Sequence, residues 1–487
     1  MSEKRPNLVI FIPDQWRGGD AGCLGNPVIH TPHLDGLASE GVAFTHAFNQ
    51  NPVCTPSRCS FMTGWYPHVR GHRDMHHMLA PEEPCLLKEL KEAGYHVLWA
   101  GKNDLLRVED VHNAYSARVE SEPGTSFWRK NPWKLGDRLY HSFLYGRLPD
   151  GNRTPDDANA DAAARFLTGG PPEPFCVYLP LTYPHPPYAI EEPYYSMYDR
   201  DKLPAIAPQP DFSKKPRLLS MIRERAGLDK LTEEDLREIL ALYYGMITKT
   251  DANLGKVLSA LRDAGLWEQT AVIFFADHGE FAGHYRLVEK AQNTFEDCLT
   301  RVPLVIKPPG KTPAQGTVSD ALVELIDFYP TVVELAGLAD THTHFGRSLL
   351  PLLRGETAGH RDVVFCEGGT LDEEEHTHEQ RRKRENIYWP RISAQNADHQ
   401  AHGKAVMVRT RRWKYVRRLY ETDELYDLEQ DPFELENRIE DPACAQVVAE
   451  LRERMLDWFL ATGDVVPYEL DPRWAGENVG DEPDFDE

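Results

Sequence analysis

Residues 8–14 read Leu8-Val9-Ile10-Phe11-Ile12-Pro13-Asp14, a continuous apolar run that a proline and an aspartate close. A run of this length and composition predicts a strand that is buried on both faces. Residues 271–277 repeat the pattern, because six apolar residues precede Asp277. Three further runs of this kind lie at residues 95–99, 175–179 and 302–306. The sequence therefore predicts a sheet whose central strands are buried.

Helical patterns alternate with these strands. The apolar residues between Leu254 and Leu261 recur at helical spacing, and Asp251 before them is typical of a helix start. Strands that alternate with helices predict an α/β core with a large, mostly parallel central sheet flanked by helices. In such sheets, ligands bind beyond the carboxyl ends of the strands, where Asp14 and Asp277 lie.

The size and charge of the chain limit the number of domains and the classes of partner that we expect. Its 487 residues exceed the usual size of one domain, which predicts a large domain and a smaller one. The formal net charge of −23 argues against a nucleic-acid partner, because phosphate binding depends on clustered Lys and Arg. The same charge repels an anionic substrate at long range, so a site for such a substrate needs local positive charge.

Signals for targeting and for disulfides are weak in this sequence. Residues 1–6 are mostly polar, and the apolar run at residues 8–12 is too short for a signal core or a membrane span. We therefore expect a cytoplasmic protein that does not enter a membrane. The eight cysteines include no Cys-x-x-Cys pair, which argues against a structural zinc site, and a disulfide framework is not expected in a large cytosolic chain.

The expected domain organisation is a catalytic domain over residues 1–369, a charged segment and a small subdomain. Two stretches, near residues 105–160 and 190–235, are rich in Pro, Tyr and charge and look inserted. Residues 370–403 combine acidic and basic runs with several His, which predicts a charged, flexible surface loop. Residues 404–487 contain short strand-like pieces and an amphipathic helix, which predict a small C-terminal α+β subdomain.

One window carries most of the chemical information. It reads Pro52-Val53-Cys54-Thr55-Pro56-Ser57-Arg58-Cys59-Ser60-Phe61-Met62-Thr63-Gly64. A helix could begin at Cys54, ahead of Pro56, and its first N–H groups and dipole would suit an anion. Arg58 follows one turn later on the same face. The window thus brings a nucleophile and a cation to one anion site, although Cys-x-Pro alone is equally compatible with a buried cysteine.

The pattern Cys-x-Pro-Ser-Arg followed by Thr-Gly resembles the signature of the sulfatase family, and the resemblance covers most of the chain. Segments that recur in the same order in that family lie at residues 7–15, 31–38, 41–44, 66–68, 101–102, 277–280 and 301–304. Residues 424–432 are similar to the family's C-terminal subdomain. The resemblance implies an alkaline-phosphatase-like sandwich with a smaller C-terminal α+β subdomain, in the alkaline phosphatase superfamily.

The family resemblance implies that Cys54 is oxidised to formylglycine by a separate enzyme, the formylglycine-generating enzyme. The hydrated aldehyde is a geminal diol: one hydroxyl attacks sulfur or phosphorus, and the other then loses its proton and expels sulfate or phosphate. Cys59 lacks the matching proline and is expected to pack as a small hydrophobic residue.

The resemblance also implies one divalent metal, held by two distant segments. Asp14 and Gln15 match ligand positions in one segment, Asp277 and His278 match them in the other, and the residue made from Cys54 completes the set. Either pair alone is also typical of a turn at a strand end. Oxygen ligands favour Ca²⁺ first or Mg²⁺, and the imidazole admits Mn²⁺ or Zn²⁺. Gln15 with His278 resembles the phosphonate monoester hydrolase branch, although His278 also fits some sulfatases.

Three further residues match family positions that contact the ester, namely Lys102, His185 and Lys290. Together with a metal and Arg58, the two lysines would neutralise charge on the transferred group. His185 could orient the ester or protonate it. Without these matches, an isolated lysine would be read as a solvated surface side chain.

One position departs from the family pattern. The family often reads Gly-Lys-x-His, whereas this chain has Asp104, which cannot imitate an imidazolium beside an anion. The leaving group is then protonated by another residue or needs little help. His284 is a candidate, because the family often has a His between Asp-His-Gly and the lysine.

The leading hypothesis is metal-dependent hydrolysis of a small-molecule or saccharide sulfate ester. Hydrolysis of phosphonate monoesters or phosphodiesters is the alternative, because both reactions use the same geometry. A Ser- or Thr-dependent phosphatase or phosphomutase disagrees with the Cys54 window. A non-enzymatic binding protein disagrees with the nearly complete set of functional residues. The charged segment 370–403 could reach a neighbouring subunit, so a homo-oligomer stays open.

Overall fold

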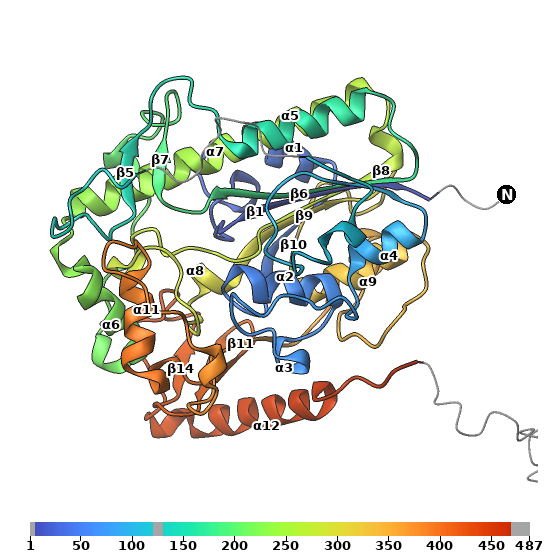
Figure 1. The fold of residues 1–487 in the computed structure, drawn as a ribbon. Helices are drawn as coiled ribbons and strands as arrows, with labels where there is room; N and C mark the ends of the chain where they lie inside the picture. Colours follow the sequence, from blue (N-terminus) through green and yellow to red (C-terminus); the bar gives the residue numbers. More distant parts are fainter. Residues whose placement is uncertain (1–4, 120–129, 469–487) are drawn as a thin grey trace, which may run out of the picture.

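The computed structural model describes residues 5–119 and 130–468, and within them eight strands form a central sheet (Figure 1). The strand order is β10-β2-β9-β8-β1-β6-β3-β4. The bounds are β1 (Asn7–Asp14), β2 (Val42–Phe48), β3 (His96–Trp99), β4 (Ala117–Arg118), β6 (Phe175–Pro184), β8 (Thr270–Phe275), β9 (Arg301–Lys307) and β10 (Thr317–Glu324). Strand β9 is antiparallel to both of its neighbours, and all other neighbours are parallel. The predicted α/β fold with a mostly parallel sheet is confirmed.

The two apolar runs that predict the fold lie side by side at the centre of the sheet. Strand β1 pairs with β8 on one side and with β6 on the other. The side chains of Leu8 to Ile12 are completely buried, as are those of Ala271 to Ala276. Because both faces of this part of the sheet are covered, its strands need apolar residues at every position.

Helices cover both faces of the central sheet (Figure 1). One face carries α1 (Pro32–Ser39), α5 (Pro155–Thr168) and α7 (Glu233–Asp263), and the other carries α2 (Cys54–Thr63), α4 (Leu86–Glu92) and α9 (Phe328–Leu335). The helical spacing at residues 254–261 lies within α7, which begins at a capping box between Thr232 and Asp235. Shorter helices are α3 (Pro67–Arg70), α8 (Asp297–Thr300) and α10 (Leu350–Leu353).

A small antiparallel sheet forms the C-terminal part. Its strands are β11 (Val364–Gly368), β12 (Ala405–Arg409), β13 (Trp413–Arg418) and β14 (Glu424–Asp427), and helix α12 (Ala445–Thr462) packs against it. Trp458 of α12 stacks on Phe365 at 4.5 Å between ring centroids and meets Tyr66 of the large domain edge-on at 4.9 Å. The small sheet therefore begins at β11, ahead of the expected boundary at residue 404. Residues 469–487 of the predicted subdomain lie outside the described residues.

The charged segment 370–403 differs from the loop that its composition predicts. It contains helix α11 (Trp389–Ala397), which has a proline in its first turn. This helix packs against α6 (Arg217–Ala226), which lies within the predicted insert 190–235. Ala394 and Ala401 bury themselves against Leu218 of α6. The loop prediction was wrong for this helix, because its apolar contacts lie on a helix far away in the sequence.

The other predicted insert, residues 105–160, contributes short elements at the edge of the large domain. Strand β5 (Leu144–Arg147) pairs with β7 (Tyr188–Ile190) in a separate two-stranded sheet, and α5 begins inside the insert. Residues 120–129 of this insert lie outside the described residues. Across the part of the chain that the structure describes, none of the helices is both long enough and apolar enough to cross a membrane.

Candidate active site

Four neighbouring parallel strands, β8, β1, β6 and β3, end at the same edge of the central sheet. Strands β1 and β8 pair in register from Asn7 opposite Thr270 to Phe11 opposite Phe274, and Asp14 and Asp277 follow just beyond the last of these pairs. Strand β6 leads to His185, and β3 leads to Lys102, whose backbone N–H donates to the carbonyl of Pro180 at 3.0 Å. The parallel topology thus gathers four predicted site positions at one edge.

Helix α2 delivers two further predicted residues, Cys54 and Arg58, to this edge. The helix begins at Cys54, after an extended Val53. The Cys54 Sγ lies 3.3 Å from His278 Nε2 and 3.5 Å from Asp14 Oδ2. One turn later, the Arg58 guanidinium donates from Nε and Nη2 to Asp277 Oδ2, at 3.0 and 2.7 Å. The helix start is therefore fixed to the end of β8 by a buried ion pair.

Asp14, Cys54, Asp277 and His278 form a cluster that could hold a metal ion. Their ligand atoms all lie within 4.8 Å of one another, and all four residues are buried. His278 Nδ1 lies 2.9 Å from the carbonyl oxygen of Gly279, which can only accept a hydrogen bond. The proton is therefore on Nδ1, and the lone pair of Nε2 faces the cluster. Two carboxylates and one imidazole, with the residue at position 54, fit a divalent cation.

Lys102 and Asp14 form an ion pair beside this cluster. Burial alone would raise the pKa of Asp14, but the nearby Lys102, His185, His278 and Lys290 hold it well below its usual range. Lys102 Nζ also lies 2.5 Å from Asp104 Oδ2. Burial would lower the pKa of Lys102, but Asp104 and Asp14 raise it well above its ordinary value. Both groups of the pair are therefore charged at neutral pH.

Gln15 lies next to the cluster and forms hydrogen bonds with several neighbouring residues. Its backbone N–H donates to Asp277 Oδ1 at 3.1 Å, and its side-chain amide donates to the carboxylate of Glu280. Its amide oxygen accepts a hydrogen bond from Lys290 Nζ at 2.8 Å. In this structure the oxygen of Gln15 thus faces Lys290. Glu280, which sequence reasoning did not assign to the site, orients the amide and directly follows Asp277-His278-Gly279.

Lys290 and His185 form a hydrogen-bonded pair at 2.9 Å between Nζ and Nε2. His185 Nδ1 lies 2.6 Å from the carbonyl oxygen of Pro186, so Nδ1 carries the proton and Nε2 accepts from Lys290. Burial and then the charge of Lys290 hold the pKa of His185 well below its usual range. Lys290 also lies 2.8 Å from Glu289 Oε1. In this pair Lys290 is therefore the protonated, charged partner, and His185 is neutral.

His284 does not belong to this site. Its Nδ1 accepts a hydrogen bond from the backbone N–H of Ala207 at 3.3 Å, and it lines a separate pocket with Arg17 and Phe433. The chain turns through positive φ angles of 59° at both Tyr285 and Arg286 before it returns to the site. This turn directs His284 away, so its proposed role as an acid is corrected.

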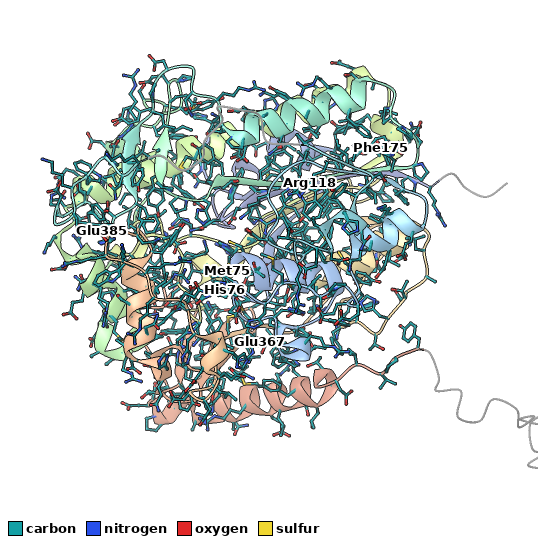
Figure 2. The ribbon with its side chains drawn as sticks, viewed as in Figure 1. Met75, His76, Arg118, Phe175, Glu367 and Glu385 are labelled. Atoms are coloured by element: carbon teal, nitrogen blue, oxygen red, sulfur yellow. The ribbon has the colours of Figure 1, made fainter. Side chains whose placement is uncertain are left out.

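Cys54 of the cluster lines a cavity of about 610 Å³. We call the lining residues that belong to the segments around the sheet edge and the start of α2 the floor: Val53, Cys54, Lys102, Asp104, Thr182, His185, Glu289 and Lys290. We call the lining residues from segments 75–76 and 379–392 the rim: Met75, His76, Glu379, Arg382, Asn386, Tyr388, Arg391 and Ile392. In Figure 2, Met75 and His76 lie between α2 and the segment that carries α11. Sequence reasoning missed the rim, because it assigned residues 370–403 to a surface loop.

Comparisons with known proteins identify the family of this chain. The family model "Sulfatase" matches residues 6–338, and the model "N-sulphoglucosamine sulphohydrolase, C-terminal" matches residues 366–459. Arylsulfatase K of Danio rerio is 30% identical over 72% of this chain and 68% of its own length. The multifunctional alkaline phosphatase superfamily protein PehA of Trinickia caryophylli is 27% identical over 94% of this chain and 96% of its own.

A solved structure, the phosphonate monoester hydrolase of Agrobacterium radiobacter, superposes with a TM-score of 0.80. It is 25% identical and covers 94% of this chain and 96% of its own. The first family model spans well over half of the 487 residues, including both halves of the buried cluster. On that length of agreement, this protein belongs to the sulfatase family of the alkaline phosphatase superfamily.

Proposed function

We propose that the protein hydrolyses sulfate esters, with a formylglycine made from Cys54 as the nucleophile. The observation that carries the proposal is the position of Cys54, whose Sγ lies within 3.5 Å of both His278 Nε2 and Asp14 Oδ2. The cavity above it gives a substrate access to this atom, and Lys102 and Lys290 line the same floor. A buried thiol that faces two metal-ligand types and two cations is suited to attack on an anionic ester.

The cation of this site would be held by Asp14, Asp277, His278 and residue 54, with Gln15 beside them. Ca²⁺ is the first choice, because most of these ligands are hard oxygens. Bound there, a divalent cation supplies Lewis-acid stabilisation of the charge on the transferred group. Arg58 orients Asp277 through its two hydrogen bonds. Lys102 offers positive charge to the equatorial sulfate oxygens.

Lys290 and His185 serve the leaving group in this proposal. Lys290 carries the proton and donates a hydrogen bond to the oxygen that departs, while neutral His185 holds Lys290 in place. This arrangement needs no imidazolium, which removes the difficulty raised by Asp104. Hydrated formylglycine supplies one hydroxyl for attack and a second whose deprotonation releases sulfate.

Hydrolysis of phosphonate monoesters or phosphodiesters is the second candidate. It is favoured by the likeness to the phosphonate monoester hydrolase of Agrobacterium radiobacter and to the multifunctional protein PehA. The same residues would serve both reactions, because the transferred groups share their geometry and differ in charge. Gln15 and His278 fit this branch as well.

The test combines peptide mass spectrometry at residue 54 with rates on 4-nitrophenyl sulfate and on an aryl phosphonate monoester. We expect the mass change for replacing the thiol and one hydrogen with a carbonyl oxygen, and faster turnover of the sulfate. Cys54→Ala should abolish turnover, whereas Cys59→Ala, in the same buried helix, should keep it. Faster turnover of the phosphonate would select the second candidate. Full activity with an unmodified Cys54 would disprove the formylglycine nucleophile.

A further inference from the structure

The rim carries an excess of positive charge that its own residues do not compensate. Arg391 and His76 share one carboxylate, that of Glu379, and Arg382 has no ion pair within the part of the chain that the structure describes. The floor differs, because Lys102 pairs with Asp14 and Asp104, and Lys290 pairs with Glu289. Since the whole chain has a net charge of −23, an uncompensated cationic patch at the cavity entrance is a local exception.

Arg391 has a donor that is not used. Its side chain is only 16% exposed, and its Nη1 donates to Glu379 Oε1 at 3.1 Å. Its Nε is buried and has no hydrogen-bond partner within residues 5–119 and 130–468. A buried guanidinium N–H without a partner costs free energy, and an anionic ligand that accepts a hydrogen bond from it would remove that cost.

Arg382 and His76 complete the patch from two directions. Arg382 is exposed, and the structure gives it no ion pair among the described residues. His76 Nε2 lies 3.4 Å from Glu379 Oε2, so it competes with Arg391 for the same carboxylate. Two guanidinium groups against one carboxylate leave the rim positive whether or not His76 is protonated.

We propose that the rim is a subsite for a second anionic group of the substrate. The favoured substrate is then a saccharide sulfate that carries a further carboxylate or sulfate, in preference to a singly charged aryl sulfate. The inference rests on the proposed function, which places the ester to be cleaved at the floor. Arginine suits this task, because its planar donors match a carboxylate or a sulfate in pairs.

The size and lining of the cavity fit such a substrate. About 610 Å³ exceeds the volume that a sulfate group alone needs and falls in the range of small-molecule sites. Met75, Tyr388 and Ile392 form the apolar part of the rim. A sugar ring would contact these side chains while its two charged groups reach the floor and the arginines.

The experiment compares four substrates on the full-length protein and its variants. The substrates are 4-nitrophenyl sulfate, a saccharide whose only charged group is one sulfate ester, the same monosulfate with an added carboxylate, and the same monosulfate with a second sulfate. Arg382→Gln and Arg391→Gln should each lower kcat/KM on a doubly charged saccharide by about tenfold or more, mainly through KM. Turnover of the two singly charged substrates should change by less than about threefold.

Matched controls separate the subsite from a folding defect. Lys383→Gln removes an exposed cation from the same segment that is not among the residues lining the cavity, and it should leave all four rates unchanged. Arg391→Lys keeps the charge and should recover part of the loss. A loss confined to the carboxylated or to the disulfated saccharide would identify which anion the rim binds. An equal loss on all four substrates, or no loss on any, would overturn the subsite.

The test also remains informative if the proposed function fails. Wild-type turnover of any sulfate ester tests the reaction, whereas the ratio between substrates tests the rim. Calorimetry on Cys54→Ala protein, with and without Arg382→Gln, measures the affinity for the same saccharides in the absence of turnover. Equal affinity for the monosulfated, the carboxylated and the disulfated saccharide in that assay would exclude the subsite on its own.

Discussion

The floor and the rim of the cavity are held in place by different kinds of contact. Floor residues such as Lys102 and His185 directly follow strands β3 and β6, whose backbone pairing sets their positions. Rim residues such as Arg391 depend on helix α11, which is attached to α6 by side-chain packing. Backbone pairing tolerates little change, whereas packed surface segments vary readily. The reaction therefore depends on residues that the central sheet positions, whereas the choice of substrate depends on surface segments that can vary.

The largest effect should come from the floor. Asp277→Asn removes the carboxylate that pairs with Arg58 and faces the metal cluster. We expect kcat on 4-nitrophenyl sulfate to fall at least about 1,000-fold and bound metal, measured by elemental analysis, to be lost. Asp320→Asn, an exposed carboxylate on β10, is the control. Full metal content together with near-normal turnover would place the cation elsewhere.

A smaller loss is expected when the leaving group loses its donor. Lys290→Met should lower turnover of an aryl sulfate by about 100-fold, and the loss should grow as the leaving alcohol becomes more basic. The slope of log kcat/KM against the pKa of the leaving alcohol measures this, with Lys383→Met as the control. A slope equal to that of the wild type would mean that Lys290 does not act on the departing oxygen.

Loss of the Glu379 carboxylate from the rim should change the stability of the protein more than its turnover of an aryl sulfate. Burial raises the pKa of Glu379, but Arg391 and His76 outweigh burial and bring it to about 2, below its ordinary value of 4.5. Its stabilising contribution is thus present above pH 4.5 and is lost as pH falls from 4.5 towards 2. Glu379→Gln should lower the free energy of unfolding by about 1–3 kcal/mol at pH 7. Thermal melting should show the gap to wild type narrowing as pH falls from 4.5 towards 2, and a constant gap would contradict this.

The smallest effect should come from outside both regions. His284→Gln should keep kcat/KM on 4-nitrophenyl sulfate within about threefold of the wild type, because His284 lines a separate pocket. The glutamine can still accept the hydrogen bond from Ala207. A loss of about 100-fold, the size expected of a general acid, would return His284 to the active site.

Much of the floor could be predicted from the sequence, because local signals mark its residues. Asp14 and Asp277 directly follow apolar runs, and Cys54 stands at a helix start ahead of Pro56. Lys102, His185 and Lys290 have no such local mark and were assigned only through the family resemblance. The parallel core sheet followed from the alternation of strands and helices, as the pairing of β1 with β6 and β8 shows.

The rim could not be predicted in the same way, because its contacts are distant in the sequence. Ala394 is buried only because α6 lies beside it, and no local apolar period reveals that packing. The prediction for His284 was wrong for a different reason. Its direction is set by positive φ angles at Tyr285 and Arg286, which non-glycine residues rarely adopt and sequence patterns do not indicate.

The in-register pairing of β1 with β8 restricts where the chain can change its length. One residue inserted between Thr270 and Phe275 would displace Asp277 by about 3.3 Å and turn its side chain to the opposite face of the sheet. The same insertion in the connection between α7 and β8, residues 264–269, would leave the pairing of β1 with β8 unchanged. Variants of this protein can therefore have longer connections between elements, whereas β1 and β8 must keep their number of residues.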